Sequence, residues 1–207
     1  MNGNDIRILK NINFEIKKNE RVAITGESGS GKTSLLMLMS GLENPSTGSI
    51  IFQNKDLSKI SDEQKTVIRK KKIGLVFQQF YLIPNYTALE NVMFPMQINK
   101  IKDEKEKATS ILSDFGLEHR KNNLPSELSG GEQQRVAIAR AISFDPEIIL
   151  ADEPTGNLDK KNTELVSNLL LNYSKRKKIS LVLVTHNINL AKMCDRVINL
   201  FDGQVKN

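Results

Sequence analysis

The strongest chemical signal in this 207-residue sequence is the stretch GESGSGKT at residues 26–33. It fits the pattern G-x-x-x-x-G-K-[ST], in which glycines let backbone N–H groups wrap a phosphate, Lys32 bridges the β- and γ-phosphates, and the Thr33 hydroxyl ligates Mg²⁺. A predicted strand, Arg21–Thr25, precedes it and an apolar helical run follows it, although a flexible turn before a helix is the plain alternative. The predicted phosphate-binding residues are Gly26, Glu27, Ser28, Gly29, Ser30, Gly31, Lys32, Thr33 and Ser34.

A second candidate is IILADE, residues 148–153, an apolar strand that ends in two carboxylates. Asp152 at the strand tip can hold Mg²⁺, directly or through water. Glu153 can polarise a water molecule that attacks a γ-phosphate. Strands often end in acidic residues, so this pattern indicates a catalytic role only in combination with the phosphate loop. The two motifs together predict nucleotide hydrolysis.

A third motif is LSGGEQQ, residues 128–134, in which Ser129, Gly130 and Gly131 precede a helix predicted over about Glu132–Ile142. The plain interpretation is a serine N-cap followed by a glycine entry. The functional interpretation is a second helix N-terminus that receives phosphate. One nucleotide does not need two such cradles from one chain. We therefore expect the second to serve a nucleotide bound by another copy of the protein.

The elements that must position these residues alternate between strands and helices, which favours an α/β fold with a mainly parallel sheet. From about residue 80 to 128 only helical spacing is seen, which predicts an inserted helical subdomain within one domain of 207 residues. The Asp202-Gly203 pair predicts a hairpin turn near the C-terminus. The predicted strands are Ile12–Ile16, Arg21–Thr25, Ser49–Phe52, Ile73–Phe77, Ile148–Ala151, Ile179–Thr185 and Arg196–Phe201; the other predicted helices are a buried one closed by Gly41, Lys161–Ser174 and a short one near Leu190.

Composition excludes several classes of protein. One cysteine and two histidines rule out a disulfide framework and make a Cys- or His-rich metal site very unfavourable. The net charge of +6 is compatible with nucleic acid, but the basic runs Arg69–Lys72 and Lys175–Lys178 contain no aromatic residue for base stacking, so a solvated face is the preferred interpretation. No stretch approaches the ~20 apolar residues of a spanning helix, so we expect a soluble, cytoplasmic chain that reaches a membrane only through a partner.

The three motifs, with a lone histidine after an apolar strand, resemble in this order those of ATP-binding cassette (ABC) ATPases, over nearly the whole chain. The resemblance implies hydrolysis of ATP with Mg²⁺ by a head-to-tail homodimer, in which each ATP lies between one subunit's phosphate loop and the other's LSGG segment. It also implies that Gln78 senses Mg²⁺ and the water, that Asn157–Asp159 cross the dimer interface, and that His186 contacts the γ-phosphate. His119 matches no motif, and we expect it on the surface.

Within the family, three stretches are most similar to the ATPase of lipoprotein-releasing complexes: YLIPNYTALENVMFP, PSELSGG and DEPTGNLD. That resemblance implies a peripheral subunit on the cytoplasmic face of the inner membrane, driving permease subunits that resemble LolC and LolE. MacB-like export ATPases and FtsE-like regulatory ATPases of cell division are the alternatives. Soluble nucleic-acid-associated members usually carry two cassettes or a long coiled coil, and neither is seen here.

Two positions depart from the family pattern. Members normally begin with a further strand and an aromatic residue that stacks on adenine, but Met1–Asn13 contain no aromatic residue. Either the chain is short at this end or adenine is held less tightly, at a cost of ~1–3 kcal/mol by analogy with base stacking. Glu132 stands where the commonest motif, LSGGQ, has glutamine, a replacement that occurs within this subfamily.

Overall fold

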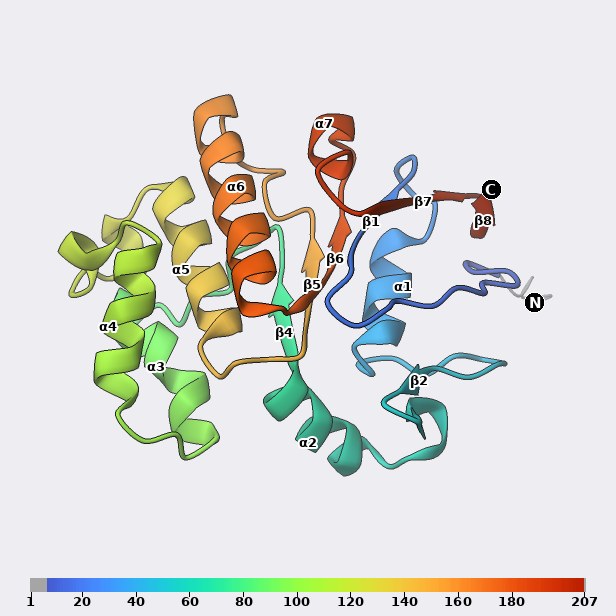
Figure 1. The fold of residues 1–207 in the computed structure, drawn as a ribbon, viewed down its shortest axis with the longest axis horizontal. Coiled ribbons are helices and arrows are strands. Elements are labelled where there is room, and N and C mark those ends of the chain that lie inside the picture. The colour runs from blue at the N-terminus through green and yellow to red at the C-terminus, as the bar shows by residue number, and fades with distance from the viewer. Residues whose placement is uncertain (1–6, 207) are drawn as a thin grey trace, which may run out of the picture.

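The computed structural model describes residues 7–206, and its centre is a six-stranded sheet (Figure 1). All neighbouring strands run parallel except the last pair, which forms the predicted hairpin at Asp202-Gly203. The mainly parallel sheet expected from the sequence is confirmed. Its order is β4 (Ile73–Val76), β5 (Ile148–Asp152), β6 (Ser180–Val184), β1 (Arg21–Thr25), β7 (Arg196–Phe201) and β8 (Gln204–Lys206). A separate small antiparallel sheet pairs β2 (Ile51–Phe52) with β3 (Lys55–Asp56).

Helices cover both faces of the sheet because its central strands are apolar on both sides. Leu150 and Val182 pack on the side of α1, whereas their neighbours Ile149 and Leu181 pack on the side of α5 and α6. The two faces therefore carry separate hydrophobic clusters, as expected for strands buried on both sides. The helices are α1 (Lys32–Met39) and α2 (Asp62–Lys72), then α3 (Ala88–Ile98), α4 (Glu104–Asp114), α5 (Gly130–Ile142), α6 (Lys160–Lys177) and α7 (Ile188–Ala191).

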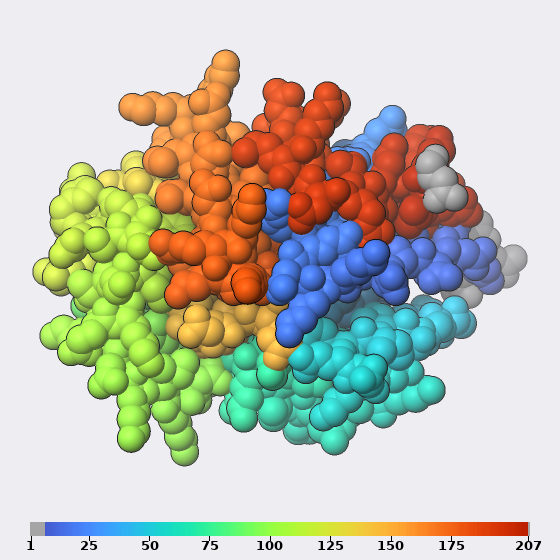
Figure 2. Space-filling view, in the orientation of Figure 1, coloured from blue at the N-terminus to red at the C-terminus, as the bar shows by residue number. Residues whose placement is uncertain are grey.

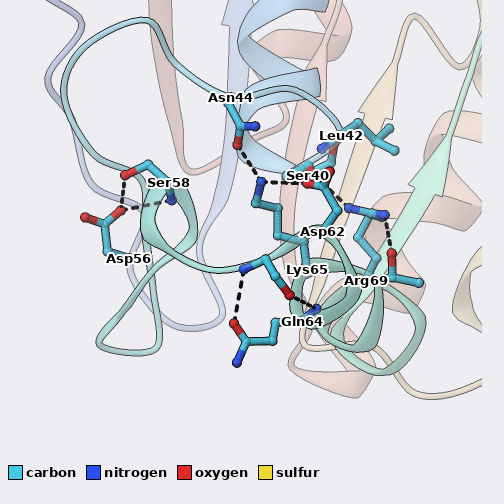
Figure 3. Close-up of polar contacts among 12 residues, drawn as sticks. Ser40, Leu42, Asn44, Asp56, Ser58, Asp62, Gln64, Lys65 and Arg69 are labelled. Carbon is cyan, nitrogen blue, oxygen red and sulfur yellow. Dashed lines mark hydrogen bonds and ion pairs between the residues drawn. The ribbon is translucent and has the colours of Figure 1, made fainter.

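Helix α2 was not predicted, because its Arg69–Lys72 run was interpreted only as a charged surface. Ser61 and Gln64 form a reciprocal capping box at its N-terminus. The buried Lys65 donates to Asn44 and to Asp62, and the Arg69 guanidinium donates to the Gly41 carbonyl at 2.7 Å (Figure 3). These bonds fasten α2 to the end of α1, and therefore to the helix that follows the phosphate loop.

Between residues 80 and 128 the structure contains α3, α4 and two 3₁₀ turns, Glu118–Arg120 and Pro125–Glu127, and no strand. Val92, Met96 and Leu112 are fully buried in the cluster that also contains the apolar face of α5. This segment forms the end of the molecule away from the termini, as its green colour shows in Figure 2. It connects the Gln78 loop to the start of α5.

The predicted strand Ile12–Ile16 is wrong. Ile12, Phe14 and Ile16 are half-buried and alternate with exposed residues, and all three pack on the α1-side cluster. The burial pattern was thus read correctly, but this backbone forms no ladder with a strand among the described residues. Alternation reports which side chains are covered, whereas a strand also needs a hydrogen-bonded neighbour.

Candidate active site at the carboxyl edge of the sheet

The predicted site residues from four motifs meet because four neighbouring strands end at the same edge. Ile24 of β1 and Asp152 of β5 are both in register with Val184 of β6, and Ala151 is in register with Val76 of β4. The next residues along the chain are therefore the phosphate loop, Glu153, His186 and Gln78. Ligands of open α/β folds bind outside the carboxyl ends of the strands, where these residues lie.

The phosphate loop follows β1 and is bent by glycines. Gly29 and Gly31 have φ values of 80° and 97°, in the left-handed region that favours glycine. A Cβ on Gly26 would lie 2.1 Å from the Leu200 carbonyl oxygen, so no side chain fits there. The Lys32 ammonium donates to the Gly26 and Glu27 carbonyls at 2.9 and 2.7 Å, which holds the charge over the loop. Among the described residues no side chain caps the N-terminus of α1, so its N–H groups favour an anion.

Thr33 and Asp152 form a pair suited to a hard cation. The Thr33 hydroxyl donates to Oδ2 of Asp152 at 2.9 Å, and the carboxyl group is buried. Burial raises the pKa of Asp152, while the Thr33 hydrogen bond and the Lys32 charge oppose that shift. The other oxygen, Oδ1, is buried and has no hydrogen-bond partner within the part of the chain that the structure describes. A buried, unpartnered carboxylate oxygen beside a hydroxyl is the oxygen-donor set that Mg²⁺ prefers, so these residues fit the ion.

Glu153 and His186 approach each other from neighbouring strands. The imidazole Nδ1 lies 2.9 Å from Oε2 of Glu153, with the carboxylate side chain 16% exposed and the imidazole 71% exposed. Glu153 has a φ of 45°, a strained conformation for this residue type, and its N–H donates to the Val184 carbonyl. Strain of this kind is concentrated at functional sites. The pair offers a carboxylate base beside a group that can donate or accept a proton.

Gln78 is joined to the loop that follows Glu153. Its Nε2 donates to the Asn157 side-chain oxygen at 2.9 Å, and the Asn157 amide donates back to the Gln78 carbonyl at 3.2 Å. A Cβ on Gly156 would lie 2.9 Å from the same Nε2, so glycine permits this close approach. Asn157 was predicted only as part of the loop that crosses a dimer interface; within one chain it also positions Gln78.

Helix α5 begins at Gly130, two residues earlier than predicted, and Ser129 is its N-cap. Ser129 and Glu132 form a capping box, and Glu132 also pairs with Arg120. The structure does not bring Ser129–Gly131 to the phosphate loop of the same chain, because α1 and α5 pack on opposite faces of the sheet (Figure 1). The predicted site is therefore divided into two parts that one chain keeps apart.

Three further residues at this edge escaped sequence reasoning. Asn162 packs against Gly131, where a Cβ would lie 2.3 Å from its Oδ1. Gln134 is fully buried, and Arg140 donates to two carbonyls near Gln78. Gln134 alone had a readable signal: it falls at helical spacing with Ala137, Ile138 and Ala141, on the apolar stripe of the helix. His119 is exposed, as expected.

Comparisons with known proteins agree with this geometry. A family model described as ABC transporter matches residues 9–156. The lipoprotein-releasing system ATP-binding protein LolD of Treponema denticola is 47% identical over 201 residues, which are 96% of this chain and 89% of that protein. A dimeric ATP-binding cassette in a post-hydrolysis state, bound to ADP and Pi, is 43% identical with a TM-score of 0.91, over 100% of this chain and 92% of that one. CbiO1 of Clostridium perfringens, part of the ABC transporter complex CbiONQ, is 32% identical with a TM-score of 0.87, over 97% of this chain and 80% of that one.

Proposed function

We propose a function from one premise: the chain belongs to the ABC transporter family and is one of its ATPases. The proposed function is to drive, by ATP hydrolysis, the release of lipoproteins from the inner membrane. The observation that carries this proposal is the 47% identity to LolD over 96% of the chain. No helix within residues 7–206 has the length and apolar character to cross a membrane. From the similarity to LolD, we place the subunit at the cytoplasmic face, held there by permease subunits that resemble LolC and LolE.

The edge of the sheet supplies the parts for hydrolysis. Residues 26–34 hold the phosphates, with Lys32 on the β- and γ-phosphates. Thr33, Asp152 and Gln78 would hold Mg²⁺, which when bound supplies positive charge that stabilises the phosphate oxygens. Support for the set comes from the unpartnered Oδ1 of Asp152 and its bond to Thr33.

Glu153 acts as the general base. The attacking water gives its proton to the Glu153 carboxylate as its oxygen bonds to the γ-phosphorus. The bond from that phosphorus to the bridging oxygen breaks, leaving ADP and inorganic phosphate. Nδ1 of His186 lies 2.9 Å from Oε2 of the same carboxylate. We assign His186 the contact with the γ-phosphate. The positive charge of Lys32 stabilises the negative charge that collects on the phosphate oxygens.

Each site is completed by a second copy of the chain. Ser129 caps helix α5, and the N–H groups of Gly130 and Gly131 in its first turn favour an anion. All three residues lie on the face of the sheet opposite α1. The similar solved cassette described above is dimeric. We therefore place the three residues on the ATP held by the partner's phosphate loop.

Mixed dimers test the arrangement in trans. Lys32→Ala subunits are mixed with Ser129→Arg subunits, and binding of ATP is measured together with turnover. In a head-to-tail dimer one site carries both lesions and the other carries neither, so the mixture should regain a nucleotide site that neither variant has alone. If Ser129 acted within its own chain, every site would carry one lesion. Mixtures with no intact site by either assay would argue against the arrangement.

The membrane partner is tested by purification from detergent-solubilised membranes. The Glu153→Gln variant, which should retain ATP, is the bait, and Lys32→Ala is the matched control that should not retain it. We expect two permease subunits resembling LolC and LolE, and ATP-dependent release of lipoprotein when the same complex, purified with the parent chain, is placed in vesicles. Recovery of an FtsX-like partner, or of a MacB-like complex that releases no lipoprotein, would instead support one of the alternative functions.

A further inference from the structure

The segment Phe77–Tyr81, which carries Gln78, follows β4 without forming a helix or a strand. Its carbonyl groups must therefore find hydrogen bonds outside regular structure. Side chains supply them: Asn157 donates to the Gln78 carbonyl, and the other donors to this segment come from α5. The backbone around Gln78 is thus held by Asn157 and by helix α5.

Gln134 is the first of these donors. Its side chain is fully buried, and its Nε2 lies 3.4 Å from the Phe77 carbonyl oxygen, a long hydrogen bond. Its Oε1 is buried and has no hydrogen-bond partner in residues 7–206. A buried, half-satisfied amide is unfavourable compared with an apolar side chain of the same size. Stability of the fold alone therefore gives little reason for a glutamine at this position.

Arg140 is the second donor, about 9 Å further along α5 at the usual helical rise. Its guanidinium donates to the Phe80 carbonyl at 3.0 Å and to the Tyr81 carbonyl at 2.5 Å. Burial lowers its pKa, and no carboxylate pairs with it within residues 7–206. An arginine stays charged in proteins, so these two carbonyls provide the protein's compensation for a half-buried cation.

Tyr81 gives independent evidence that this segment is held in place. Its φ is 45°, in the left-handed region that a tyrosine rarely adopts, and its side chain is largely exposed. Such a conformation is strained and persists only where the surroundings impose it. The Arg140 bond acts on the Tyr81 carbonyl itself, and the Tyr81 ring meets that of Phe77 edge-on at 5.5 Å. The turn is thus held by contacts on both sides of Gln78, at Phe77 and at Tyr81.

We propose that Gln134 and Arg140 are positioning residues for Gln78, which fix its backbone to the helix that begins at Ser129. The proposal rests on the proposed function, because Gln78 is taken there as a residue that contacts the reacting groups. It adds that α5 serves two sites: its first turn contacts the partner's ATP, and its later side chains set the position of Gln78 for the chain's own ATP.

A double-mutant cycle between Arg140→Lys and Gln78→Ala tests the proposal. Lysine keeps the charge but lacks the planar fork that reaches two carbonyls. We expect Arg140→Lys alone to lower kcat about tenfold or more with little change in KM, as for an interaction that acts mainly on the chemical step. In the Gln78→Ala background the same substitution should change kcat by less than about twofold, because two residues that act through one another are not additive.

Arg69→Lys is the matched control. Arg69 is also half-buried and donates to a backbone carbonyl, that of Gly41 (Figure 3), but it lies on α2 and not on α5. Its kcat should stay within about twofold of the parent. An equal loss of kcat for Arg140→Lys with and without Gln78, or no loss at all, overturns the proposal. If the parent hydrolyses ATP but Gln78→Ala does so equally well, the role of Gln78 fails and the proposal fails with it.

Gln134→Leu keeps the test available if Arg140→Lys does not fold. Leucine removes the weak bond to Phe77 together with the unpartnered Oε1, so the unfolding temperature should stay close to that of the parent. We expect kcat to fall all the same, and again only when Gln78 is present. An unchanged kcat, or a kcat that falls only in step with thermal stability, would show that Gln134 merely packs the helix.

Discussion

Replacing Asp152 with asparagine should separate the stability of the protein from its activity. The buried carboxylate is unfavourable in its charged form, which is why its pKa is raised from 3.8. A raised carboxyl pKa means that the folded protein loses this part of its stability as the pH rises from about 3.8 through the raised value. Asparagine is neutral at every pH and avoids that loss. The metal-free variant should therefore be about as stable as the parent near pH 7.

The raised pKa of Asp152 is the net result of burial, which disfavours the charge, and of the Thr33 hydrogen bond and the Lys32 charge, which favour it. Each unit by which the pKa was raised returns about 1.4 kcal/mol when the charge is removed. The asparagine oxygen remains a neutral acceptor for the Thr33 hydroxyl, as a protonated carboxyl would be, so this hydrogen bond adds no separate loss. We expect a net change within about 1 kcal/mol, or roughly 2–4 °C in Tm for a chain of this size. Mg-ATP at 100 times its Kd adds about 2.7 kcal/mol to the parent, and a tenfold weaker Kd halves that gain.

Thermal unfolding of both proteins after treatment with EDTA, and then with Mg-ATP, provides the measurement, with phosphate release measured in parallel. Asp152→Asn should match the parent without metal, show a much smaller rise in Tm with Mg-ATP, and lose at least about 100-fold in kcat. A metal-free variant that unfolds more than about 4 °C below the parent would refute the reasoning, because the carboxylate would then stabilise the fold. A full Mg-ATP response would remove Asp152 from the metal site.

Three further outcomes follow from the same geometry. Lys32→Ala should fold normally by circular dichroism and retain less than about a tenth of the parent turnover, since within residues 7–206 its ammonium donates hydrogen bonds only to two loop carbonyls. Glu153→Gln should bind Mg-ATP without hydrolysing it, and size-exclusion chromatography with Mg-ATP should then show a dimer; a monomer would contradict the shared site. Cys194, whose pKa burial raises from 9.0 to about 11, should react with a thiol reagent at pH 8 about 100-fold more slowly in the native protein than in urea, and equal rates would contradict its burial.

The parts of the fold that the sequence predicted are those fixed by local signals. The strand Arg21–Thr25 is confirmed to the residue, Gly41 ends α1 with a φ of 66°, and Asp202-Gly203 makes the hairpin turn. Helix α2 was missed although Ser61 and Gln64 offered a capping signal, because the charges that follow hid it. The prediction of a strand at Ile12–Ile16 is wrong for the opposite reason: the pairing of strands is decided by distant parts of the chain.

The same division holds for the candidate site. Motif residues such as Lys32 and Asp152 could be named because phosphate and Mg²⁺ demand particular residue types at particular spacings. Gln134 and Arg140 could not be connected to Gln78, because their partners are backbone carbonyls 57 to 60 positions earlier in the chain. Every residue carries the same backbone carbonyl, so a side chain that donates a hydrogen bond to one leaves no pattern in the sequence.

Helix α5 has a consequence for how two nucleotides in the proposed dimer influence one another. Suppose that ATP bound at Ser129 of one chain alters, through Arg140, the ATP affinity of that chain's own phosphate-loop site. ATP bound at the phosphate-loop site must then alter the binding of ATP at Ser129 by the same factor. A two-fold symmetric pair contains this linkage twice, once in each direction. The structure of the pair therefore gives neither site precedence in binding or hydrolysing ATP. Any lasting order in which the two sites hydrolyse ATP must be imposed from outside the pair, by membrane subunits that differ from each other.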